Sequence, residues 1–128
     1  MKRFSPPFIP HNFGGLPKEL TNLKKSKVVV LPIPYDQTVS YRPGTRDGAA
    51  AIITASKYVE LYDSELNTDI SKIGIHTFDE LEPEMKGPAE MSKRIYMTAQ
   101  WVLSQNKFLV TLGGEHSISI GIVKAISE

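Results

Sequence analysis

A histidine in a short glycine-rich turn is the residue whose surroundings best suit chemistry. Residues 108–112 (FLVTL) are apolar and are followed by GGEHS at residues 113–117. Apolar residues then recur at helical spacing over 118–126, so the pattern predicts a strand, a sharp turn and a helix that Ser117 could cap. Neutral imidazole commonly binds divalent metals, which makes His116 a candidate metal ligand. The alternative is that His116 only helps to close the turn, because one histidine makes no metal site.

A second polar loop is expected at the same edge of the sheet as this turn. After Lys27, residues 28–33 form an unbroken, Val-rich apolar run, which predicts a parallel strand over 27–33 buried on both faces. The loop after this strand carries Tyr35, Asp36, Tyr41 and Arg42. Ligands bind at the carboxyl ends of parallel strands, so we expect the loop to lie beside His116. We expect Arg42 and Arg46 to hold the loop against carboxylates or carbonyls.

The remaining elements alternate as in an α/β protein. Strands are predicted at 58–62 and 72–76, and helices from residue 49 and over 88–105. Thr45 or Asp47 could cap the helix that begins at residue 49. The helix at 88–105 carries an apolar stripe that we interpret as core, formed by Met91, Ile95, Ala99 and Val102. The resulting order is strand, helix, strand, strand, helix, strand, helix.

Four stretches of the chain, taken together, are more specific than the turn alone. They are LPIPYD at 31–36, SYRPGTRDG at 40–48, GIHT at 74–77 and GGEHS at 113–117. In this order they resemble the arginase and agmatinase family, the ureohydrolases, and the 40–48 stretch resembles agmatinases more than arginases. The resemblance implies an arginase-like, three-layer α/β/α fold with a mainly parallel sheet. It also implies that His116 binds one of two Mn²⁺ ions, which activate water to hydrolyse a guanidino substrate such as agmatine to putrescine and urea.

The other metal-binding motifs of that family are missing. An Asp-x-His-x-Asp motif and an Asp-x-Asp motif are expected after the GGEHS turn, and neither occurs up to Glu128. We therefore expect residues 28–128 to be the N-terminal part of a ureohydrolase α/β domain, with an incomplete sheet and no activity by itself. The unpaired sheet edge needs a cover, and full-length relatives assemble, so we expect a homo-oligomer. The alternative is a non-catalytic oligomerising or regulatory module derived from the same fold.

Two other metal sites can be drawn from the sequence. His76 is followed by acids at 79, 80 and 82, and a site could also combine His11, His76 and His116. The first spacing matches no familiar ligand motif, and acids after a strand are usually solvated. Both are weaker candidates than the family site.

Composition excludes several classes of protein. The 128 residues, 41% apolar and 23% charged, suit one soluble globular domain. A net charge of +1 gives no reason to expect nucleic acid or a membrane surface as partner. Without cysteine, any metal must be held by His, Asp, Glu or backbone oxygen. No apolar run approaches the roughly 20 residues that cross a bilayer, so we expect a cytoplasmic protein.

Residues 1–27 are expected to form an N-terminal arm. Their prolines and glycines exclude a regular helix or a central strand. They hold six Lys or Arg against Glu19 alone, whereas residues 60–90 hold nine acids against two lysines. We expect the arm to lie on the domain or on a neighbouring subunit, with Phe8 and Phe13 as anchors. The alternative is a partly disordered tail.

Overall fold

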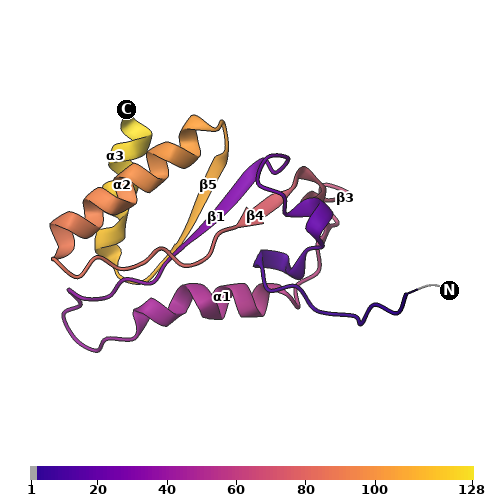
Figure 1. Ribbon diagram of the computed structural model, residues 1–128, viewed down its shortest axis with the longest axis horizontal. Coiled ribbons are helices and arrows are strands. Elements are labelled where there is room, and N and C mark those ends of the chain that lie inside the picture. Colours follow the sequence, from indigo (N-terminus) through magenta and orange to yellow (C-terminus); the bar gives the residue numbers. More distant parts are fainter. Residues whose placement is uncertain (1–2) are drawn as a thin grey trace.

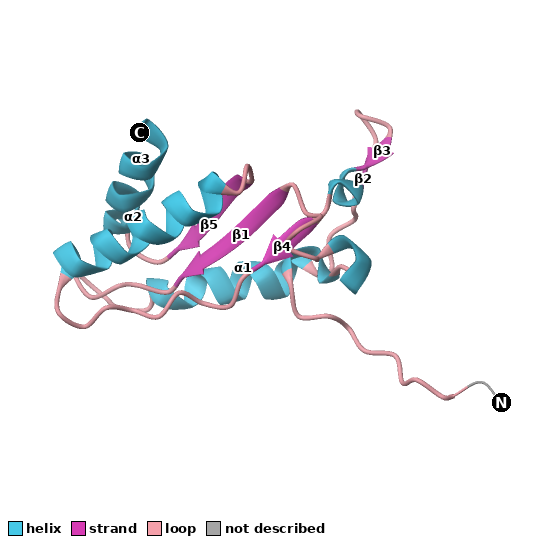
Figure 2. Ribbon diagram, turned by 45° about the horizontal axis from the view of Figure 1, so that its top comes forward, coloured by secondary structure: helices cyan, strands magenta, loops and turns pink. Residues whose placement is uncertain are grey.

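The computed structural model describes residues 3–128 and shows helices on both faces of a parallel sheet (Figure 1). The sheet contains β1 (Val28–Ile33), β4 (Ile75–Thr77) and β5 (Phe108–Gly113), in the order β4-β1-β5. The helices are α1 (Gly48–Ser56), α2 (Pro88–Ser104) and α3 (Ser119–Ser127). Helix α1 covers one face of the sheet, and α2 and α3 lie together on the other (Figure 2). The predicted three-layer α/β/α architecture is therefore confirmed.

Strand β1 is the centre of the sheet. It pairs in parallel with β5 at six positions, from Val28 opposite Phe108 to Ile33 opposite Gly113. On its other side it pairs in parallel with β4 at three positions. Because helices cover both faces, nearly all of β1 is buried, which explains its continuous apolar sequence. Strands β1 and β5 end side by side, so the loops that follow them meet at one edge.

The apolar stripe of α2 forms the core of one face, as predicted. Met91, Ile95, Ala99 and Val102 are each 1% exposed or less. Two of these side chains pack in one cluster with residues from β1, the loop after it and the turn before α3, namely Leu31, Ile33, Tyr35 and Ile118. The helix begins at Pro88, where a missing N–H is harmless, and ends one residue before the predicted limit.

Two predicted strands are wrong in whole or in part. Residues 58–61 are not extended, because the N–H groups of Tyr58 and Val59 donate to carbonyls at the end of α1. Only a small antiparallel ribbon follows, formed by β2 (Tyr62–Asp63) and β3 (Thr68–Asp69) outside the main sheet. The strand predicted at 72–76 begins only at residue 75, because Ile70–Ile73 forms a 3-10 turn.

The predicted helix caps are also wrong. Neither Thr45 nor Asp47 caps α1 with its side chain. A 3-10 turn, Thr45–Asp47, runs directly into the helix, so Asp47 has helical backbone angles rather than the extended ones of a capping residue. Ser117 does not cap α3 either, because it lies within the turn His116–Ile118 and its hydroxyl donates to Glu115.

The described part of the N-terminal segment is attached to the body by its second half. Phe8 is 82% exposed and does not anchor the segment to this chain, and residues 1–2 of the predicted arm lie outside the described residues. Phe13 is partly buried, and its N–H donates to the Thr77 hydroxyl of β4. Leu16, 1% exposed, is the anchor that the sequence interpretation missed. Over residues 3–128, no helix is both long and apolar enough to cross a membrane.

Candidate functional site

The loops that follow β1 and β5 meet through a backbone contact at Gly114. The N–H of Glu115 donates to the carbonyl oxygen of Tyr35 at 2.8 Å. A Cβ atom on Gly114 would overlap that same carbonyl group. Glycine is therefore required at residue 114 by the close approach of two backbones. The predicted meeting of the two loops is confirmed.

Glu115 binds the loop after β1 with its side chain. The carboxylate is in a residue only 8% exposed, and it accepts the N–H of Thr38 at 2.7 Å. It also accepts hydrogen bonds from the hydroxyls of Thr38 and Ser117. Burial acts to raise the pKa of Glu115, but these hydrogen bonds from Ser117 and Thr38 outweigh burial and leave the pKa below its ordinary value. A charged carboxylate therefore lies at the junction of the two loops.

Asp36 is a second buried carboxylate at the same edge. It is 4% exposed and accepts the N–H of Gly44 at 2.6 Å and the N–H of Arg46 at 3.3 Å. The Arg46 guanidinium lies 3.8 Å away, as expected for an arginine that holds the loop. The Gly44 N–H, followed by the Arg46 contacts, keeps the pKa of Asp36 below its ordinary value despite burial. The other arginine of this loop, Arg42, instead lies over the ring of Tyr41.

Tyr35 lies between these carboxylates and the core. Its side chain is buried, and its hydroxyl has no hydrogen-bond partner among residues 3–128. Burial, with a smaller contribution from the charge of Glu115, raises the pKa of Tyr35. The phenol therefore stays neutral and packs in the core cluster with Leu31 and Ile33 of β1.

His116 is the exposed residue of this group. It begins the 3-10 turn His116–Ile118, directly after the buried Glu115. No hydrogen bond to its imidazole is found in the described part of the chain. Its ring nitrogens are thus free to bind an external partner.

The other two histidines, His11 and His76, do not form a metal-binding cluster with His116. The Nδ1 atom of His76 lies 2.7 Å from the Thr21 carbonyl oxygen, and the His76 ring packs edge-on against Phe78. The Nδ1 atom of His11 lies 2.7 Å from the ammonium of Lys57. Among residues 3–128 there is no group of three or more His, Asp or Glu that could hold a metal ion. Both alternative metal sites drawn from the sequence are therefore wrong.

This donor set does not fit a dinuclear metal site. His116 offers one imidazole, while the nearby carboxylates of Asp36 and Glu115 are occupied by hydrogen bonds within the two loops. A stable metal site needs several ligands held in place by their neighbours. The described residues could therefore supply one imidazole ligand, that of His116, but not a complete dinuclear metal site.

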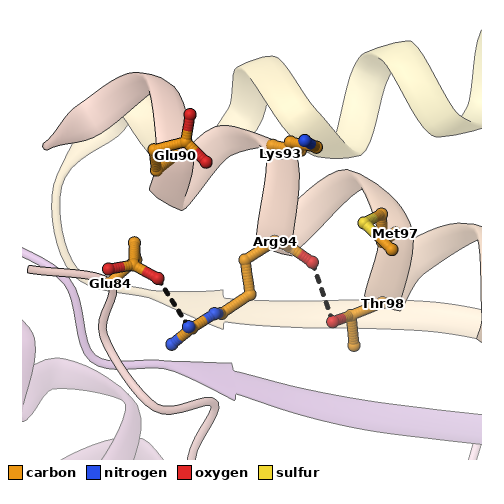
Figure 3. A pocket seen from close by; sticks show the side chains of 6 residues that line it. All are labelled: Glu84, Glu90, Lys93, Arg94, Met97 and Thr98. Carbon is orange, nitrogen blue, oxygen red and sulfur yellow. Dashed lines mark hydrogen bonds and ion pairs between the residues drawn. The ribbon is translucent and has the colours of Figure 1, made fainter. Parts of the chain in front are cut away.

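A surface groove of about 350 Å³ lies elsewhere, along α2 (Figure 3). Arg94 projects into it and donates to the Glu84 carboxylate at 2.6 Å and to the Glu82 carbonyl at 2.7 Å. The guanidinium is therefore already bound within the chain. These contacts of Arg94 fasten the loop before α2 to the helix. The groove is therefore a weaker candidate for a functional site than the edge that carries His116.

The fold and the edge define a class of α/β protein in which loops at the carboxyl ends of parallel strands carry the ligand-binding residues. The chain belongs to the arginase family, whose family model matches residues 26–128. The resemblance noted in the sequence is thus confirmed.

Several relatives within this family have names that state an activity. The chain is 36% identical to the N(1)-aminopropylagmatine ureohydrolase of Synechocystis, 40% to that of Thermus thermophilus and 35% to the agmatinase of Bacillus cereus. These alignments cover 93%, 82% and 87% of this chain, but 42%, 36% and 38% of the relatives. The chain therefore spans roughly two fifths of the length of the relatives that it matches.

Solved structures of similar proteins also match most of this chain but only part of their own length. The agmatine ureohydrolase of Thermoplasma volcanium superposes with a TM-score of 0.79 at 28% identity, covering 92% of this chain and 39% of that one. The formiminoglutamase of Trypanosoma cruzi, solved with Mn²⁺, gives a TM-score of 0.69 at 20% identity, covering 80% and 36%. The second comparison concerns the fold alone.

Proposed function

We propose that this chain forms the N-terminal part of a manganese-dependent ureohydrolase and carries its first metal ligand, His116. The observation that carries the proposal is an exposed imidazole on a turn at the carboxyl edge, where the neighbouring Glu115 is buried and hydrogen-bonded. Imidazole is a common ligand of divalent metals, carboxylate oxygen suits Mn²⁺, and the chain has no thiol that would favour a softer metal.

The proposed substrate is a guanidino compound on a polyamine chain, with agmatine first. One water and agmatine would give putrescine and urea. The names of the relatives, agmatinase and N(1)-aminopropylagmatine ureohydrolase, support this substrate class. Such a reaction belongs to polyamine biosynthesis in the cytoplasm.

We propose that residues 1–128 are inactive by themselves, because the remaining metal ligands lie outside this sequence. The test is the manganese-to-protein ratio of the purified 128-residue chain after equilibration with Mn²⁺ and removal of the excess. We expect a ratio near zero, since one imidazole binds Mn²⁺ weakly. A ratio near two would contradict the proposal, because the chain or its oligomer would then complete a dinuclear site.

A test of His116 as a metal ligand needs a longer polypeptide that contains the other metal ligands. A chimera should join this chain to the remaining part of the Thermus thermophilus ureohydrolase, with the parent enzyme as reference. We expect urea release from agmatine or its aminopropyl derivative, and His116→Ala should lower both Mn²⁺ affinity and kcat/KM by about 100-fold. The matched control is His11→Ala, which removes an exposed imidazole of the N-terminal segment.

The alternative is a non-catalytic oligomerising or regulatory module derived from the same fold. The described residues favour it in one respect, since they contain no cluster of metal ligands. A folded chimera that binds Mn²⁺ normally when His116 is alanine would contradict the ligand role, whereas a folded chimera that binds no Mn²⁺ with His116 present would support this alternative.

A further inference from the structure

Glu115 is a buried charged group that the proposed chemistry leaves unused. It lies between the required Gly114 and the exposed His116, and its side chain turns inward rather than toward the edge where His116 is exposed. A buried carboxylate is unfavourable unless its oxygens are hydrogen-bonded. Here every hydrogen bond that it accepts comes from a residue beside the proposed ligand or from the facing loop.

We propose that Glu115 is a positioning residue that fixes His116 by fastening the turn after β5 to the loop after β1. The proposal rests on the proposed ligand role of His116, but its geometry is independent of the metal. Glu115 touches His116 only through the chain, so it acts on the backbone of the turn rather than on a substrate.

The hydrogen bond from Ser117 joins the two residues that flank His116 in the chain. The Ser117 hydroxyl donates to the carboxylate of Glu115, so the residues on both sides of His116 are joined by their side chains. The N–H of Ser119 also donates to the carbonyl oxygen of His116 and closes the 3-10 turn. These bonds restrict the backbone of His116 while its imidazole stays exposed.

The hydrogen bonds from Thr38 fix where the turn lies. The Thr38 N–H donates to Oε2 of Glu115 at 2.7 Å, and its hydroxyl donates to Oε1. Together with the bond from the Glu115 N–H to the Tyr35 carbonyl, they join the two loops by main chain and side chain. The turn therefore cannot move without the loop that Asp36 holds through Gly44.

The test measures order at His116 by ¹⁵N relaxation and exchange of the Thr38 amide in the 128-residue chain. Glu115→Ala should lower the His116 backbone order parameter from about 0.85 to below about 0.6. The Thr38 amide should exchange at least roughly 10-fold faster, beyond any change in global exchange. The control is Glu90→Ala, which removes an exposed carboxylate from the first turn of α2.

A conservative variant separates positioning from general stabilisation. In Glu115→Gln the amide oxygen can accept the Thr38 N–H, and the NH₂ group can donate to the two hydroxyls, which also accept. Glu115→Gln should therefore restore most of the order at His116. Unchanged order in Glu115→Ala, or the same loss of order in both variants, would overturn the proposal.

Ser117→Ala keeps the test decisive if Glu115→Ala does not fold. This variant removes only the bond that brackets His116 and leaves both contacts from Thr38. We expect loss of order at His116 while the Thr38 amide stays protected, and unchanged order at His116 would overturn the proposal. Neither measurement depends on metal or turnover, so failure of the ligand role in the chimera would leave this result intact.

Discussion

The close approach of two backbones makes Gly114 the least replaceable glycine of the site. Gly114→Ala should destabilise the chain by about 2 kcal/mol or more, because the new methyl group overlaps the Tyr35 carbonyl and the loops must separate. Gly48→Ala is the matched control. Its methyl group would lie 3.4 Å from the Gly113 carbonyl, an ordinary contact, and alanine at the start of α1 should stabilise by about 0.5 kcal/mol. Urea unfolding of both variants measures these differences, and equal effects would contradict the argument.

Asp36 should make stability depend on pH in the acid range. Its pKa is lower in the folded chain than in the unfolded chain, so folding favours the charged form. The resulting stabilisation is complete above the unfolded pKa of about 3.9 and is lost as the pH falls through the lower folded value. Urea unfolding between pH 6 and pH 3 should show this loss in the parent chain and a smaller one in Asp36→Asn. Asp47→Asn controls for removing one negative charge from the same loop.

An unchanged slope in Asp36→Asn would show that Asp36 does not contribute to the acid sensitivity. The sign is the useful part of this prediction. A group whose folded pKa was raised would lose its stabilisation as the pH rises, so a chain that gains stability on acidification would contradict the contacts from Gly44 and Arg46.

At the site, residue types in sequence predicted some contacts and could not predict others. His116 lies at the carboxyl edge and Arg46 pairs with a carboxylate, that of Asp36, both as expected, whereas Arg42 lies over the ring of Tyr41. The partnership of Glu115 with Thr38 was missed, because the residues are 77 positions apart and no local pattern joins them. The only signal was an acid placed next to a glycine that the turn requires. Ser117 had the right type for a cap, yet its hydroxyl found a nearer acceptor.

Helix α2 should be the element whose core face contributes most to stability. Ile95 is 1% exposed and packs in the cluster that includes Leu31 and Ile33 of β1, so Ile95→Ala should destabilise by about 3 kcal/mol through lost contacts and a cavity. Met97, on the same helix, is 59% exposed, and Met97→Ala should change stability by less than about 0.5 kcal/mol. Thermal or urea unfolding distinguishes the two faces, and similar losses would contradict the assigned face.

Periodicity predicted the long elements well and the short ones poorly. The stripe of α2 runs from Met91 to Val102, about three turns, and β1 is apolar throughout, so few other structures could bury them. Residues 58–61 alternate as a strand would, but the N–H groups of Tyr58 and Val59 donate to carbonyls in the last turn of α1. Residues 70–73 form a turn because the Asp69 side chain accepts the N–H of Ser71 and Gly74 has a φ of 80°. Such local hydrogen bonds decide short segments and are invisible to periodicity.

At the scale of the whole molecule, the sheet formed by residues 3–128 has one long unpaired edge. Strand β5 bonds to β1 on one side only, and most of its residues are only partly buried despite their apolar sequence. Helix α3, which packs against α2, buries Gly121 and Ala125 but exposes an apolar stripe of Ile120, Val123 and Ile126, each more than 60% exposed. An edge strand and an apolar helix face together favour association. In the relatives, which are more than twice as long, additional chain is available to cover such surfaces.

We therefore expect the 128-residue chain to self-associate through this face at micromolar concentration. Val123→Lys places a charge in the centre of the α3 stripe and should shift the chain toward a 14.2 kDa monomer in sedimentation velocity. Ile52→Lys, at a 46% exposed residue of α1 on the opposite face of the sheet, should leave association unchanged. A parent chain that stays monomeric at these concentrations would contradict the prediction. Association that is equally weakened by both variants would assign it to general solubility rather than to the α3 face.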